Sequence, residues 1–137
     1  MANNDGLRTV GPVRAGEHLI KGTQVSTIAT AAAVTFTAAQ ILGGMILRDP
    51  NGAHRADLVP LATAIWDAMG PEPEAGASFE FTIRNTADAA ETITVTTNTG
   101  VTMSGTMTIA QNNSKRFLYV AASRAAGTLY SLGTVVH

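Results

Sequence analysis

The sequence contains no cysteine and few charged or aromatic residues. Without cysteine, the chain has no disulfide, no thiolate nucleophile and no zinc–thiolate site. Charged residues make up 14% of the 137 residues, which is well below the roughly one quarter of an average soluble protein. The 9 Lys and Arg residues are balanced by 10 Asp and Glu residues, so no positive field attracts phosphates and we expect no nucleic-acid partner.

Long apolar runs are missing as well. Hydrophobic residues nevertheless make up 45% of the chain, which excludes intrinsic disorder. The longest weakly apolar stretch, residues 28–36, is interrupted by Thr30 and Thr35 and is too short to span a bilayer. The first residues, MANNDGLRTV, lack the apolar segment of a secretory signal peptide. The sequence therefore predicts synthesis in the cytoplasm and no membrane partner.

Residues 1–33 show no sustained hydrophobic period and end in the small-residue run VSTIATAAA. Such a segment cannot form a core of its own, so we interpret it as an extended N-terminal arm with a short strand at Leu19–Ile20. It is either a free tail or an arm laid across a neighbouring subunit. In the second case its candidate contact residues are Leu7, Arg8, Val10, Val13, Arg14, Leu19, Ile20 and Lys21.

Two helical signals follow in the next part of the chain. Thr37 and Gln40 have the spacing of a capping box, and Gly43-Gly44 supplies a stop, so a short helix is expected over 38–42. The run ADLVPLATAIWDAMG places apolar residues at helical spacing. It predicts one amphipathic helix over about 57–69, with Asp57 as N-cap and Pro60 in the first turn.

Residues 75–137 alternate between apolar and polar side chains, as strands do, in FEFTIRN, ETITVTT and VTMSGTMTI. KRFLYVAAS and TLYSLGTVV complete the set, and the joints between these segments are short. The pattern predicts a mainly β fold, an antiparallel β-sandwich or barrel with the one amphipathic helix and the arm. The β-rich domain is expected to cover residues 34–137.

Catalytic and metal-binding patterns are not found. His18, His54 and His137 are scattered, Ser104 lies in a strand pattern rather than a nucleophile elbow, and the carboxylates fall in turns and caps. We therefore expect no catalytic residue, no metal, no cofactor and no enzymatic activity.

Threonine repeats at alternate positions of two successive strand segments, at Thr92, Thr94, Thr96, Thr102, Thr106 and Thr108. On adjacent strands these residues would form one flat face of hydroxyl and methyl groups. That face is open to three interpretations: a solvent-facing surface, a subunit interface, or a surface for sugar or ice.

The segments TFTAAQILGGMILRDPNGAHRADLVPLATAI, GASFEFTIRNT, TITVTTNTGVTMSGTMTI and TLYSLGT resemble small structural proteins of tailed bacteriophages, in particular capsid decoration (cement) proteins. The resemblance covers roughly residues 35–133 and depends most on Gly43-Gly44, Arg48-Asp49, Asn51-Gly52, Arg55, Asp57 and Pro60. It implies a virion protein on the outer capsid surface, acting as a homotrimer that bridges subunits of the major capsid protein.

Combined with the apolar helix face and the threonines, this implied trimer gives a candidate interface of Leu58, Leu61, Ile65, Trp66, Met69, Thr92, Thr94 and Thr96. The alternative is a phage tail or fibre module that binds a host glycan. A glycan site would need exposed aromatic residues, and the sequence offers only Tyr119 and Tyr130, both in predicted strands.

Overall fold

A computed structural model describes residues 22–137 of the chain. In this range the chain forms nine strands and two helices, which confirms the mainly β fold. In chain order they are β1 (Gln24–Ile28), α1 (Ala38–Gly43), β2 (Gly44–Arg48), β3 (Arg55–Leu58), α2 (Ala62–Ala68), β4 (Ser78–Asn85), β5 (Ile93–Thr96), β6 (Val101–Ser104), β7 (Thr108–Ile109), β8 (Asn113–Ser123) and β9 (Ala126–Val136). No helix among these residues has the length and apolar character needed to cross a membrane.

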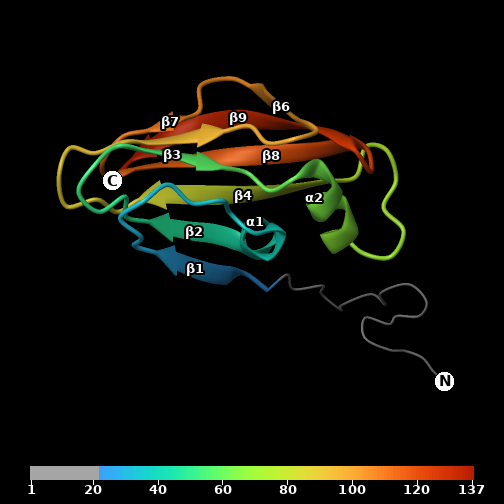
Figure 1. Cartoon of the computed structure of the whole chain (residues 1–137), viewed down its shortest axis with the longest axis horizontal. Helices are drawn as coiled ribbons and strands as arrows, with labels where there is room; N and C mark the ends of the chain where they lie inside the picture. The colour runs from blue at the N-terminus through green and yellow to red at the C-terminus, as the bar shows by residue number, and fades with distance from the viewer. Residues whose placement is uncertain (1–21) are drawn as a thin grey trace, which may run out of the picture.

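The strands form two open sheets and, within residues 22–137, no closed barrel. The larger sheet has the order β1-β2-β4-β8-β9-β6, and the smaller has the order β3-β5-β7. The smaller sheet lies over one face of the larger, and α1 and α2 lie next to each other, with α1 beside the start of β2 (Figure 1). The core between the layers includes Phe81 stacked on Phe117, with ring centroids 5.3 Å apart.

Strand direction is mixed rather than antiparallel throughout. β4, β8 and β9 pair antiparallel, as expected, but β1 with β2, β2 with β4, β3 with β5 and β6 with β9 all pair parallel. Parallel neighbours need a crossover connection, and α1 and α2 lie in two such connections. Alternating hydrophobicity identifies a strand but not its direction, so the sequence pattern could not distinguish the two arrangements.

The amphipathic helix expected over 57–69 is shorter, because residues 55–58 form β3 and α2 begins at Ala62. Asp57 is therefore a strand residue and not a helix cap. Its neighbour Leu58 exchanges backbone hydrogen bonds with the segment before α1, where Leu58 N donates to Val34 O and Phe36 N donates to Leu58 O. This tertiary pairing, together with Pro60, prevents the helix from starting earlier.

The short helix α1 confirms the capping-box prediction. Thr37 Oγ1 accepts a hydrogen bond from Gln40 N at 3.1 Å, and Gln40 Oε1 accepts one from Thr37 N at 2.9 Å. Gly44 ends the helix with φ 104°, a left-handed conformation that favours glycine. β2 follows directly, so α1 fixes where this strand of the larger sheet, which lies between β1 and β4, begins.

Two segments differ from the expected boundaries. Residues 24–28, which we assigned to the arm, form β1 and pair with β2, so the folded part already includes Gln24. The segment VTMSGTMTI is not one strand, because β6 belongs to the larger sheet and β7 to the smaller. Gly105 lies between them with φ +99°, and a Cβ there would be 2.7 Å from Ser131 Oγ. Gly105 is therefore the point where the chain passes from the larger sheet to the smaller one.

Candidate functional site

The most polar part of the interior is an ion pair between Arg48 at the end of β2 and Asp57 in β3. Both side chains are fully buried, and Arg48 Nε lies 2.7 Å from Asp57 Oδ2. A second hydrogen bond joins Arg48 Nη2 to Asp57 Oδ1 at 3.1 Å. This two-point contact is the strong geometry for an arginine and a carboxylate, and it connects the larger sheet to the smaller one.

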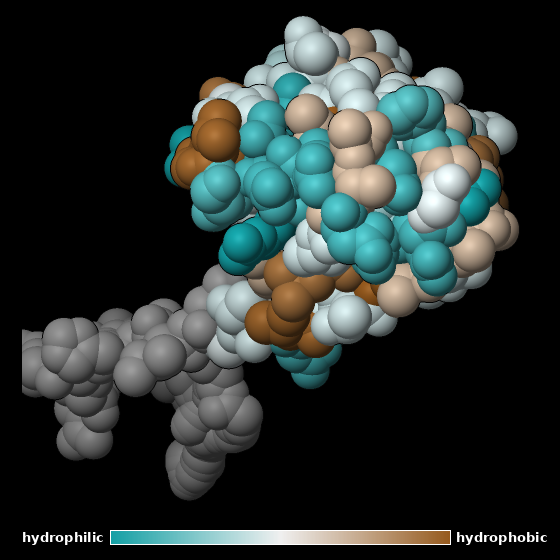
Figure 2. Space-filling view, turned by 90° about the vertical axis from the view of Figure 1, so that its left-hand side faces the viewer, coloured by the Kyte–Doolittle hydropathy of each residue, from teal (hydrophilic) through white to brown (hydrophobic). Residues whose placement is uncertain are grey.

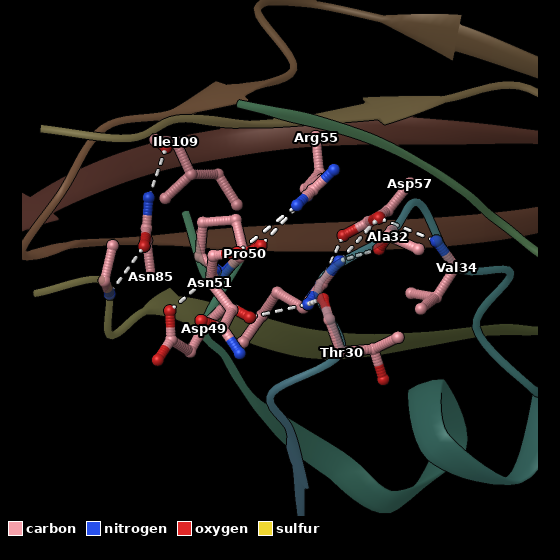
Figure 3. Close-up of polar contacts among 12 residues, drawn as sticks. Thr30, Ala32, Val34, Asp49, Pro50, Asn51, Arg55, Asp57, Asn85 and Ile109 are labelled. Atoms are coloured by element: carbon pink, nitrogen blue, oxygen red, sulfur yellow. Dashed lines mark hydrogen bonds and ion pairs between the residues drawn. The ribbon is translucent and has the colours of Figure 1, made fainter. Parts of the chain in front are cut away.

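The remaining donors of Arg48 bind backbone carbonyls, two of which lie in the connection between β1 and α1. Nη1 donates to Thr30 O at 2.9 Å and to Asp49 O, and Nη2 donates to Ala32 O at 2.7 Å. Asp57 Oδ1 also accepts a hydrogen bond from Val34 N at 3.0 Å (Figure 3). All five N–H groups of the guanidinium are thus used, so this cluster fixes the chain just after β1.

The loop between β2 and β3 is held by the other positions on which the resemblance depends. Asn51 N donates to Asp49 Oδ1 at 2.9 Å, and Arg55 Nε donates to Pro50 O at 2.9 Å. Asn51 and Gly52 both have positive φ, 54° and 97°. Asn51 Nδ2 also donates to Ala29 O at 3.1 Å, and Gly52 N donates to Glu91 Oε1 at 3.0 Å. These residues therefore hold the loop in shape and connect it to neighbouring segments of the chain.

Groups with potential chemistry do not converge in the part of the chain that the structure describes. Residues 22–137 contain no cluster of three His, Cys, Asp or Glu residues that could hold a metal ion. His54 Nδ1 accepts from Thr92 N at 2.9 Å in a loop. At the exposed Arg124–Asp67 pair, the hydrogen bond from Arg124 lowers the pKa of the Asp67 carboxyl.

The predicted interface residues lie in several places. Leu61 is 44% exposed at the start of α2, whereas Ile65 is 1% exposed and belongs to the core of its own chain. Trp66 and Met69 are partly buried against that core. The helix face that was expected to contact a partner subunit therefore packs largely against the core of its own chain.

The threonine face is divided between the two sheets. Leu58 of β3 lies beside Thr96 of β5, and Thr94 lies beside Thr108 of β7, with hydroxyl oxygens 3.3 Å apart. Thr102 lies in β6 of the other sheet, because β5 and β6 are not neighbours. Thr92 just precedes β5, so three residues of the candidate interface, Thr92, Thr94 and Thr96, remain together on the smaller sheet.

Other predicted residues are outside the described range or buried. The candidate arm contacts between Leu7 and Lys21 lie outside the residues that the structure describes. Tyr119 is 1% exposed, which leaves it no surface for stacking on a sugar, whereas Tyr130 is 39% exposed.

The outer face of the larger sheet was not identified from the sequence. By register, this face carries Val25, Met45, Leu47, Thr82, Arg84, Ser114, Arg116, Leu118, Val120, Tyr130 and Val135. The helices and the smaller sheet pack against the opposite face, with the core. Val25 and Val135 are 59% and 58% exposed, at opposite sides of the sheet. The run FLYVAA in β8 is the sequence feature that indicates an apolar outer face, because its residues are apolar on both faces of the strand.

The second half of β9 is an open edge of this sheet. β6 pairs with β9 only as far as Tyr130, so residues 131–136 have β8 on one side and no described strand on the other. Three apolar residues are exposed along this edge, Leu132 (41%), Val135 (58%) and Val136 (76%). At this end of the molecule, Figure 2 shows apolar side chains in two places with hydrophilic ones between them.

A shallow hollow of about 250 Å³ lies beside this edge, on the outer face. It is lined by Thr82 of β4, Ser114 and Arg116 of β8, and Gly133, Thr134 and Val135 of β9. Arg116 makes a contact of 3.4 Å with Glu80, and both side chains are more than half exposed. The lining is therefore hydroxyl-rich and cationic, which suits an acidic group.

Comparisons with known proteins add no relative to this description. No protein-family model, no curated protein sequence and no solved structure matches the chain significantly.

Proposed function

We propose that the chain is a structural virion protein, resembling the head decoration proteins of tailed phages. In this proposal it binds the outer capsid surface as a homotrimer and stabilises the shell by bridging subunits of the major capsid protein. The supporting observation is the uncovered outer face of the larger sheet, with exposed Val25, Tyr130 and Val135. These exposed apolar side chains lie on β1 and β9, at opposite sides of the face, and exposed apolar surface of this kind is typical of protein–protein interfaces.

The build of the molecule suits such a role. The buried Arg48–Asp57 pair ties both sheets to the connection after β1, so the exposed face is carried by a rigid support. Three copies acting together would convert weak single contacts into firm attachment, because linked sites bind with a high effective concentration. A bridging protein gains from this multivalency wherever capsid subunits meet.

The proposal is tested with heads of the encoding virus that lack this protein. Purified protein is added, and occupancy is measured by electron cryomicroscopy while shell strength is measured as resistance to heating. We expect a trimer by native mass spectrometry, saturable binding and a more resistant shell. A protein that stays monomeric and does not bind to heads would contradict the proposal.

The trimer contact is tested separately at Leu61, which is 44% exposed at the start of α2. Leu61→Lys places a charge where the candidate interface would bury an apolar side chain, so the trimer should dissociate. Ala53→Lys, in the exposed loop between β2 and β3, is the matched control and should leave the mass unchanged. Trimers that persist in Leu61→Lys would exclude this part of the surface from the interface.

The arm is tested by deleting residues 1–21, which precede β1. If this segment lies across neighbouring capsid subunits, the truncated protein should occupy fewer sites on heads than the full chain. Equal occupancy would remove the arm from the proposal and leave the sheet face as the contact.

A further inference from the structure

We propose that the hollow and the open edge of β9 bind an extended acidic segment of another polypeptide. The segment adds a strand beside residues 131–136 and places a carboxylate in the hollow, near Arg116 and Arg84. This inference deepens the proposed function and rests on it, because it specifies the kind of capsid segment that the protein recognises.

The edge of β9 supplies backbone groups for a new strand. An unpaired strand edge presents a row of N–H and C=O groups, and extended peptides bind to such edges by adding a strand. β6 occupies this side of β9 only from Gly127 to Tyr130. Leu132 and Val136 are 41% and 76% exposed beyond that point, so they can pack against side chains of the added strand.

The positive charge comes from Arg116, which lines the hollow, and from Arg84, which lies opposite the lining residue Ser114. Thr82 lies opposite Arg116, and Arg84 lies opposite Ser114, so the two arginines are diagonal neighbours on adjacent strands. Arg84 Nε is buried and has no hydrogen-bond partner among residues 22–137. The Arg116–Glu80 contact is exposed and long, at 3.4 Å, and contacts of this kind are weak. A carboxylate from a partner would form stronger, charge-assisted hydrogen bonds with the exposed guanidinium of Arg116.

Charge also decides against a segment of this chain as the occupant. Residues 1–21 carry Arg8, Arg14 and Lys21 against Asp5 and Glu17, so their balance is positive. β1, the opposite edge of the same sheet, has the sequence QVSTI and contains no acidic residue. Neither segment brings a surplus of negative charge to the two arginines, whereas an acidic segment of a different polypeptide does.

The first experiment titrates the full-length protein with two capped six-residue peptides and follows its backbone amides by NMR. The test peptide alternates valine and threonine and carries one central glutamate, and the control has lysine in place of glutamate. We expect the glutamate peptide to shift the amides of residues 131–136 and to bind about tenfold more tightly than the lysine peptide. Equal binding of both peptides, shifts confined to other strands, or no binding would overturn the inference.

The second experiment uses variants. The double variant Arg84→Gln and Arg116→Gln should lose about tenfold in affinity for the glutamate peptide. Arg124→Gln removes one charge at the far end of β8 and should have no effect. The amide spectrum of each variant verifies its fold, and the peptide comparison on the unaltered protein does not depend on the variants. Unchanged affinity in a folded double variant would overturn the inference.

A third measurement separates this inference from the proposed function. Heads lacking the protein are incubated with the unaltered chain and with the double variant. Binding of the unaltered chain with reduced binding of the variant supports both. Equal occupancy by both proteins would retain the decoration role and overturn the acidic-segment site, while failure of the unaltered chain to bind would contradict the role itself.

Discussion

A buried charge is stable only when its hydrogen-bonding groups are satisfied, and Arg48 meets this condition with five hydrogen bonds. The sequence placed Asp57 at a helix cap because the aspartate precedes residues with helical spacing. Its true partner is nine residues earlier in a strand of the other sheet. Such a pairing follows from how the sheets pack, which local patterns do not contain.

Asp57→Asn should therefore destabilise the protein strongly. The substitution leaves the Arg48 charge buried without its counter-ion, and breaking a buried pair in this way costs about 3–5 kcal/mol. The free energy of unfolding in urea measures the effect. Asp67→Asn is the matched control, because it breaks an exposed pair with Arg124 and should change stability far less. Similar losses for both variants would contradict the structural role of the buried pair.

Lys115 is a second inward-facing charge, 4% exposed, and its Nζ donates to Thr106 O at 2.7 Å. Burial lowers the pKa of Lys115 from its usual 10.5. Between the lowered pKa and 10.5, the unfolded chain binds more protons than the folded one, so this residue makes stability rise with pH.

Lys115→Met should remove that contribution. The unfolding free energy of the unaltered protein minus that of Lys115→Met should increase as the pH is raised from 7 towards 10.5. Urea unfolding at several pH values gives this difference. Burial also raises the pKa of Tyr119. Because Tyr119 is present in both proteins, its contribution to the unfolding free energy largely cancels in the difference. A flat difference would show that the Lys115 ammonium is not destabilised by burial.

At the scale of elements, local sequence signals predict the positions of helices and strands better than they predict how the strands pair into sheets. The capping box located α1, and alternation located β4, β5, β8 and β9. The same alternation could not show that β1 pairs parallel with β2, or that β6 and β7 belong to different sheets. Those features depend on contacts between residues far apart in the sequence.

The start of α1 gives a test at this scale. Thr37→Ala removes the side-chain oxygen that accepts from Gln40 N, and loss of such a cap costs about 1 kcal/mol. Thermal unfolding should show a lower Tm for Thr37→Ala, whereas Thr37→Ser keeps the hydroxyl and should stay close to the unaltered protein. If both variants melt alike, the capping bond contributes no measurable stability.

At the scale of the whole molecule, the strands differ in how well their neighbours protect them. β8 lies between β4 and β9 along most of its length, whereas β7 has two residues and, among residues 22–137, pairs only with β5. Native-state hydrogen exchange should therefore be slowest in β8, with Phe117 among the slowest amides, and faster at Thr108 and Ile109. Uniform protection across both sheets would indicate that they open only together.

The candidate site also belongs to this scale, and the sequence did not reveal it. Arg84, Arg116 and Val135 lie on three different strands, so nothing in their spacing marks them as neighbours. Only the apolar run in β8 indicated that both faces of the sheet would be apolar. The virion role remains a proposal, supported by the resemblance and by the uncovered face.

The parallel pairing of β1 with β2 has a mechanical consequence. Tension on the chain before Gln24 would pull along β1 and load its bonds to β2 in shear, so they must break together rather than peel apart one by one. After β1, hydrogen bonds from the Arg48 side chain to the carbonyl groups of Thr30 and Ala32 hold the chain in place. If the chain before β1 is attached to neighbouring capsid subunits, as proposed, expansion of the shell would load the β1–β2 hydrogen bonds together.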